Sequence, residues 1–142
     1  MKDKINIEEE IVTKPKVVAD DARGIIEQLT DKPFYSVLRI TSKKGSVRAN
    51  HYHQKDSHLC YLVFGKIRYV YRDALDEKAP LQEKIINPGD LFFTPPMIAH
   101  AMHFLEDSEF YTFSGLKREQ GAYEEDLIRV VLVSPEEAAH VS

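Results

Sequence analysis

The chain has 142 residues, 43% of them hydrophobic, and a formal net charge of −4, which suits one domain with its own core. Because acidic and basic residues are interspersed and the acids prevail, the composition argues against a nucleic-acid or anionic-membrane surface. The single cysteine, Cys60, excludes an intramolecular disulfide and fits a reducing compartment.

Charged and β-branched residues occur together at the N-terminus. The first residues, MKDKINIEEE, are too charged for a signal peptide. The longest apolar run, LCYLVF, is far shorter than the roughly 20 residues that cross a bilayer. We therefore expect a cytoplasmic protein without a membrane partner. Residues 1–20 are predicted to form an arm or edge strand, residues 21–133 a β-barrel, and residues 134–142 a C-terminal tail.

Short β-type runs divided by turn residues follow one another along the chain. The predicted strands are 36–41, 46–53, 58–64, 66–72, 81–86, 91–94, 98–104, 109–115 and 127–133. In one of them Ile67, Tyr69 and Tyr71 share one parity, which predicts a half-buried strand. Strands at this spacing, with few helices, predict an all-β barrel or sandwich.

Turn and cap signals mark two further places. In NPGD, residues 87–90, Pro88 and Gly89 suit the central positions of a type II turn. Ser134, Pro135 and Glu137 are typical of an N-cap, a first-turn proline and a capping-box acid. We expect one short helical turn after Ser134 and another within residues 117–126.

The histidines are concentrated in the middle of the chain. On a strand, residues i and i+2 point to the same face, so His51 and His53 can converge on one metal ion or one substrate. Imidazole suits zinc, iron, copper or nickel, and His58 and His100 are candidates for further ligands. The other interpretation is two polar side chains on one strand face, and the H-x-H pair alone does not decide between them.

The spacing of these residues resembles the two motifs of the cupin family. The matching residues are Gly45, His51, His53, His58 and Gly65, then Gly89, Pro95 and His100. The resemblance covers residues 45–104 and implies a single jelly-roll β-barrel with a metal site inside. Three residues depart from the motifs: His58 stands where cupins have glutamate, Met97 where they have glycine, and Phe104 where they often have asparagine. If His58 is a ligand, four neutral imidazoles leave the site with the metal's full charge. If His58 does not bind the metal, three histidines leave coordination positions open for water or substrate.

A narrower resemblance extends from residue 21 onward. The pieces are DARG (21–24), SKKGSVRANHYH (42–53), PPM (95–97), FLED (104–107) and YEEDLIR (123–129). In this order they are similar to cupins that act on nucleotide sugars: deoxysugar 3,4-ketoisomerases, the cupin domain of capsular-sugar reductases, and dTDP-4-dehydrorhamnose epimerases. The resemblance implies an isomerase or epimerase that acts on a nucleotide-linked keto-deoxysugar in polysaccharide biosynthesis.

The resemblance also implies roles for individual residues. His51 and His53 are expected to be the acid–base pair, since proton abstraction beside a carbonyl needs a base that titrates near neutral pH. Arg48 matches an arginine expected near the sugar or its phosphates, which a guanidinium binds in bidentate fashion. A tyrosine acid remains open among Tyr69, Tyr71 and Tyr111, for each of which core packing is the alternative.

Metal binding and proton abstraction exclude each other at one nitrogen of His51. We expect a divalent transition metal (Zn, Fe, Ni, Mn or Cu) held by His51, His53, His58 and His100, and no organic cofactor. Two alternatives stay open, a metal-dependent cupin dioxygenase and a non-catalytic small-ligand-binding cupin. The expected partners are a small-molecule substrate and a second copy in a homodimer, by analogy of fold.

Overall fold

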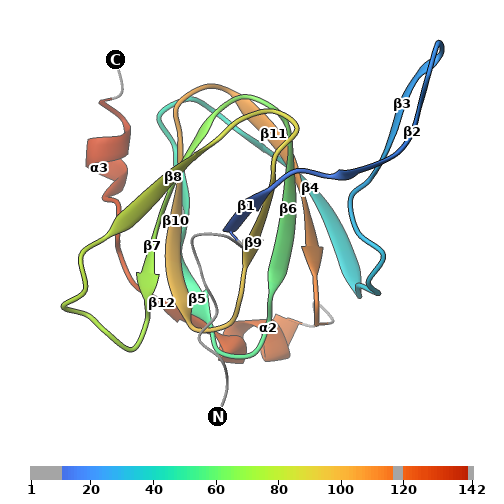
Figure 1. Cartoon of the computed structure of the whole chain (residues 1–142). Helices are drawn as coiled ribbons and strands as arrows, with labels where there is room; N and C mark the ends of the chain where they lie inside the picture. The colour runs from blue at the N-terminus through green and yellow to red at the C-terminus, as the bar shows by residue number, and fades with distance from the viewer. Residues whose placement is uncertain (1–10, 117–119, 141–142) are drawn as a thin grey trace.

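Two five-stranded antiparallel sheets face each other across the core in the computed structural model, which describes residues 11–116 and 120–140 (Figure 1). The strands are β1 (Val12–Thr13), β2 (Lys16–Asp21), β3 (Gly24–Gln28), β4 (Ser36–Ser42), β5 (Val47–His53), β6 (His58–Phe64), β7 (Ile67–Asp73), β8 (Gln82–Ile86), β9 (Leu91–Thr94), β10 (Ile98–Phe104), β11 (Ser108–Ser114) and β12 (Leu127–Arg129). Two short helices are α2 (Gln120–Asp126) and α3 (Pro135–Ala138). The sheet orders are β1-β9-β6-β11-β4 and β12-β5-β10-β7-β8. The expected all-β jelly roll with short helical turns is confirmed.

The local turn and cap predictions are confirmed as well. Gly89 has φ +88°, and the amide of Asp90 donates to the carbonyl of Asn87 at 3.0 Å, as a type II turn requires. The hydroxyl of Ser134 accepts from the amide of Glu137 and caps α3. Met97 has φ +66°, the left-handed conformation that a glycine adopts without strain.

Two elements differ from the prediction. The strand expected over 127–133 ends at Arg129, because the next residues leave the sheet and cross its outer face. Strands β2 and β3 form a two-stranded hairpin that the sequence patterns did not indicate, and it projects away from the barrel (Figure 1). The arm or edge strand expected at the N-terminus falls partly on residues 1–10, which lie outside the described residues.

The side chains inside the barrel are apolar at one end and polar at the other. Apolar side chains such as Ile67, Phe104 and Phe110, each with no exposed surface, fill one end. Cys60, a predicted core residue, is buried in the same cluster. Along β10 the inward positions pass from Phe104 back to His100, so the opposite end is lined by polar groups. This gradient leaves a cavity at the polar end.

The outer face of the second sheet carries its own small core. Val70 and Ala101 point outward from β7 and β10 and pack under Val133 and Ala138 of the C-terminal segment. Both faces of these two strands are therefore covered, which explains why β7 is more buried than a half-buried strand. Among the described residues, no helix is long and apolar enough to cross a membrane.

Candidate functional site

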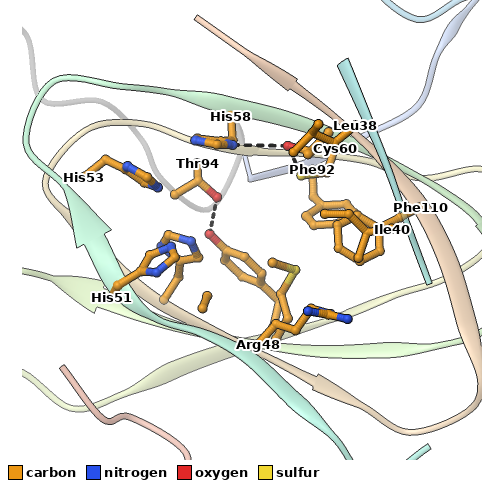
Figure 2. Close-up of a pocket in the computed structure, with 15 residues that line it drawn as sticks. Leu38, Ile40, Arg48, His51, His53, His58, Cys60, Phe92, Thr94 and Phe110 are labelled. Atoms are coloured by element: carbon orange, nitrogen blue, oxygen red, sulfur yellow. Dashed lines mark hydrogen bonds between the residues drawn. The ribbon is translucent and has the colours of Figure 1, made fainter. Parts of the chain in front are cut away.

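A cavity of about 200 Å³ lies between the two sheets. Its lining residues come from both sheets and are Leu38, Ile40, Arg48, Ala49, His51, His53, His58, Cys60, Tyr69, Phe92, Thr94, His100, Met102, Phe110 and Thr112. Figure 2 shows His51, His53 and His58 grouped on one side of the cavity, with Arg48 at another edge. The cavity therefore combines an imidazole cluster, an apolar floor and one guanidinium.

All four histidines of the expected metal site line this cavity. His51 and His53 lie two residues apart on β5, while His58 begins β6 and His100 lies on β10 opposite His51. Ring centroids are 4.8 Å apart for His51–His53, 4.9 Å for His51–His100 and 4.5 Å for His53–His58. The structure thus brings the four imidazoles together, and their ligand roles remain a prediction.

A buried carboxylate supports His53 from behind. Nδ1 of His53 lies 3.1 Å from Oδ2 of Asp126, and both side chains are at least 90% buried. Asp126, the last residue of α2, also accepts the amides of Lys55 at 2.6 Å and Asp56 at 3.2 Å. With Nδ1 directed at the carboxylate, the chemistry of His53 toward the cavity belongs to Nε2.

A second carboxylate lies beside His58. Nε2 of His58 is 3.0 Å from Oδ2 of Asp56, although the two atoms are not aligned for a hydrogen bond. Nδ1 of His58 lies 3.1 Å from the hydroxyl of Thr112 (Figure 2). Ligand atoms of His53, Asp56 and His58 all lie within 4.8 Å of one another. Two imidazoles and a carboxylate at this distance are a donor set that suits a divalent transition metal.

Neither carboxylate was assigned a role from the sequence. Asp126 lies inside YEEDLIR, one of the pieces that carry the family resemblance, so a signal was present without a function attached to it. Asp56 lies in the polar stretch between β5 and β6, and a single acid in a loop carries no local signal. His58 stands where cupins have glutamate, and Asp56 places a carboxylate next to it.

The imidazoles of His51 and His100 are neutral at pH 7. Burial, together with the neighbouring imidazoles, lowers the pKa of His51 to about 2 and that of His100 to about 3. Burial and His58 also lower the pKa of His53, against the upward effect of its bond to Asp126. Burial alone would raise the pKa of Asp56, but its contacts with His58 and His53 outweigh that effect and lower it. Neutral imidazoles are the form that binds a metal or accepts a proton.

Acid is therefore expected to destabilise the fold between pH 7 and pH 5. In the unfolded chain a histidine binds its proton near pH 6.5, whereas folded His51 and His100 stay neutral to far lower pH. Below pH 6.5 the unfolded state binds more protons, so the free energy of unfolding falls as the pH falls. Each of the two histidines should remove about 2 kcal/mol by pH 5.

Urea denaturation at pH 7 and pH 5, in the presence of a chelator, measures this change. The His51→Gln variant cannot titrate at that position and should lose the share of His51 in the pH dependence, about 2 kcal/mol between pH 7 and pH 5. Equal free energies of unfolding at the two pH values would contradict the prediction. The window lies above the ordinary pKa of Asp and Glu, so carboxylates contribute little to it.

Arg48 reaches the cavity from the same strand as the two central histidines. Its Nε donates to the hydroxyl of Ser42 at 2.7 Å and its Nη2 to the carbonyl of Thr41 at 3.0 Å. Arg48 also borders a surface hollow of about 550 Å³ that includes Lys43 and Ser46. The guanidinium thus lies between the cavity and an open surface hollow that Lys43 and Asp107 also border.

The three candidate tyrosines occupy different places. Tyr69 lines the cavity, is fully buried, and its hydroxyl is hydrogen-bonded to that of Thr94 (Figure 2). Burial raises the pKa of Tyr69. Tyr71 packs against Tyr69 at 5.7 Å between centroids and does not line the cavity. Tyr111 alternates with Phe110 and Thr112, which point inward, so it lies on the outer face of β11. Only Tyr69 remains a candidate acid.

Comparison with known proteins gives a family match and several structural likenesses. The family described as "Cupin" matches residues 34–136, whereas no curated protein matches the chain in sequence. The dTDP-4-dehydrorhamnose 3,5-epimerase from Sulfolobus tokodaii has a TM-score of 0.63 at 22% identity, covering 78% of this chain and 72% of that one.

Two further solved structures share the fold. The sugar 3,4-ketoisomerase QdtA from Thermoanaerobacterium thermosaccharolyticum, in complex with TDP, has a TM-score of 0.67 at 17% identity and covers 83% of this chain and 85% of its own. The dTDP-6-deoxy-D-glucose-3,5-epimerase RmlC from Legionella pneumophila, in complex with dTDP-4-keto-L-rhamnose, has a TM-score of 0.65 at 19% identity and covers 92% and 77%. At these identities the likeness concerns the fold.

Proposed function

This chain belongs to the cupin family, and from that premise we propose that it is an isomerase or epimerase of a nucleotide-linked keto-deoxysugar. The observation that carries the proposal is the buried His53–Asp126 pair, 3.1 Å apart, at the wall of a cavity that also holds Arg48. A histidine oriented by a carboxylate is suited to move a proton at a carbon beside a ketone. The structural likeness to two epimerases and a ketoisomerase supports the same class of reaction.

The size of the cavity supports a substrate of which only one part is enclosed. About 200 Å³ is less than the roughly 300–1,000 Å³ of pockets for drug-sized ligands, so one sugar ring would lie inside. Arg48 and Lys43 border the hollow outside and offer a diphosphate a guanidinium and an ammonium, beside the one carboxylate of Asp107. In this proposed binding mode the nucleotide lies at the surface and the reacting carbons lie beside the histidines.

Within this proposal each residue has a separate task. Nε2 of His53 removes the proton beside the ketone, and Asp126 holds the ring and stabilises the imidazolium that forms. His51, neutral at pH 7, is the second member of the expected acid–base pair. Tyr69, on β7 of the same sheet, is the candidate acid, and its hydroxyl is held by Thr94 of the opposite sheet. Arg48 binds and orients the substrate.

Metal binding is the alternative task of Nε2 of His53, because His53, Asp56 and His58 form a donor set that fits a divalent transition metal. Nε2 of His58 is buried, with the carboxylate of Asp56 at 3.0 Å but no aligned hydrogen bond, and a metal ion would satisfy it. A bound ion would act as a Lewis acid toward a carbonyl oxygen of the substrate. The expected ligands His51 and His100 adjoin this group, with ring centroids 4.8 Å and 6.4 Å from that of His53.

Hydrogen exchange with solvent tests the proposal. The protein is incubated in D₂O with dTDP-4-keto-6-deoxyglucose, and deuterium at the carbons beside the ketone is followed by NMR. Incorporation well above the protein-free rate is expected, with a new sugar isomer. The absence of incorporation with both dTDP- and UDP-linked ketosugars would reject the proposal.

A dioxygenase is the second candidate function, and one observation favours it. Two histidines and one carboxylate around open positions are the arrangement of many non-haem Fe(II) oxygenases. Metal analysis of the purified protein, followed by oxygen consumption with Fe(II), tests this alternative. A zinc-bound protein that consumes no oxygen would exclude it.

We also propose that the protein is a homodimer. The β2–β3 hairpin projects from the barrel (Figure 1), and its apolar residues Val17, Val18, Ile25 and Ile26 are each more than 50% exposed. An isolated two-stranded hairpin is marginally stable in water, and β4 lies at a sheet edge with Val37 exposed. A second copy would cover both surfaces, and sedimentation equilibrium measures the resulting mass. The cytoplasmic location stays a prediction.

A further inference from the structure

Strand β5 contains a bulge between Arg48 and His51, two residues that the proposed function uses. His51 pairs with His100 of β10, and Arg48 pairs with Met102. Three steps along β5 therefore match two steps along β10, with Asn50 as the extra residue. Ala49 and Asn50 have φ of +71° and +54°, both in the left-handed region that is strained for a residue with a side chain.

The bulge decides on which face of the sheet Arg48 lies. In a regular strand, residues three apart point to opposite faces. Without the extra residue, Arg48 would pair with His103, which points outward and contacts Ala138. With the extra residue, Arg48 pairs with Met102, and both line the cavity together with His51.

The side chain of Asn50 holds this bulge from outside the cavity. Its Oδ1 accepts the amides of Leu132 at 2.9 Å and Val133 at 3.1 Å, and its Nδ2 donates to the carbonyl of Val133 at 2.8 Å. The backbone carbonyl of Asn50 accepts the amide of Val130 at 2.9 Å. The C-terminal segment is thus attached to the bulged residue at four points.

Asparagine combines the two properties that this position needs. It tolerates the left-handed conformation better than other residues with a Cβ. Its amide offers an acceptor and a donor on one short side chain, which match two N–H groups and one carbonyl of the segment. Val133 is then anchored in the small outer core with Val70 and Ala101, so a strained backbone is kept in place by contacts more than 80 residues away in sequence.

We propose that Asn50 is a positioning residue that turns Arg48 into the cavity by fastening the β5 bulge to the C-terminal segment. The role of Arg48 toward a diphosphate rests on the proposed function, whereas the position of Arg48 does not. The C-terminal segment, residues 130–140, thereby becomes part of the support of the site, although none of these described residues lines the cavity.

Binding of dTDP by calorimetry tests the proposal with three variants at this position. Asn50→Val removes the amide and disfavours the left-handed conformation, Asn50→Gly removes the amide alone, and Asn50→Asp keeps both the conformation and the acceptor. We expect dTDP affinity to fall about tenfold or more in Asn50→Val, less in Asn50→Gly and least in Asn50→Asp. In an Arg48→Ala background the Asn50→Gly change should cause no further loss, because two residues that act through one contact are not additive.

A second measurement is independent of any ligand. The Nε–H of Arg48 is bonded to the hydroxyl of Ser42 and should give a protected NMR signal in the wild type. Loss of that signal in Asn50→Gly, with the remaining core signals unchanged, supports the proposal even if the wild type does not bind dTDP, a result that would count against the proposed function alone. An unchanged signal in both Asn50→Gly and Asn50→Val would overturn it. An equal loss of dTDP affinity from Asn50→Gly in the wild-type and the Arg48→Ala backgrounds would overturn the proposal as well.

Discussion

The His53→Ala variant is expected to lose the solvent exchange of the substrate by a factor of about 10²–10⁴, the usual contribution of a positioned acid or base. The physical reason is that His53 is the histidine whose ring is oriented by a buried carboxylate, at 3.1 Å from Asp126. Alanine removes the proton acceptor and leaves that carboxylate without its imidazole. The measurement is deuterium incorporation into the ketosugar, beside the melting temperature of the variant.

His103→Ala is a matched control for this variant. His103 is also a buried histidine on the barrel, 7% exposed, and its Nε2 donates to the carbonyl of Ala138. It points to the outer face of β10 and is outside the cavity, so its loss should lower stability and leave exchange within about twofold of the wild type. A similar loss of exchange in both variants would contradict the assignment of His53.

The metal content of His53→Ala separates two roles for this histidine. If His53 binds an ion with Asp56 and His58, the variant should lose the metal together with activity. If His53 moves the proton, activity should fall at unchanged metal content, or in a protein that contains none. If His53 is a metal ligand, the Asp126→Asn variant should also bind the metal more weakly. Removal of a carboxylate that supports a ligand weakens metal affinity by about 10–100-fold.

Gly65→Ala is expected to be the most destabilising single substitution among the glycines that the structure describes. A Cβ at Gly65 would lie 2.0 Å from Oγ and 2.6 Å from Cα of Ser108, so the clash involves backbone and not only a movable side chain. Gly65 also has φ +105°. Overpacking costs about 1–3 kcal/mol and the left-handed backbone about 1–2 kcal/mol, so the free energy of unfolding should fall by about 2–5 kcal/mol.

Gly89→Ala is the control that separates the two costs. Gly89 has a similar φ of +88°, but a Cβ there meets nothing within 4 Å. Its substitution should cost only the backbone strain, about 1–2 kcal/mol. Urea denaturation of both variants measures the difference, which reports the contact of Gly65 with Ser108. Equal losses in the two variants would show that this contact is not tight.

Local patterns by themselves determined most of the strands and the composition of the histidine cluster. Side chains alternate with period two on any strand, so an H-x-H pair shares a face whatever the rest of the fold does. Gly89 and Ser134 were equally predictable, because a type II turn and an N-cap are decided within four residues. His58 and His100 entered the same prediction because each lies on another predicted strand, and the cupin spacing then supported this grouping.

Only the tertiary structure decided which other groups join the histidines. Asp126 reaches His53 from a helix 73 residues away, and an acid in an otherwise ordinary segment has no local pattern that predicts such a contact. Arg48 violates the period-two rule relative to His51, and it lines the cavity because Asn50 is held in a bulge by residues 132 and 133. The stabilising contacts of that bulge are long-range, so the side-chain alternation that predicts a strand cannot reveal where it is interrupted.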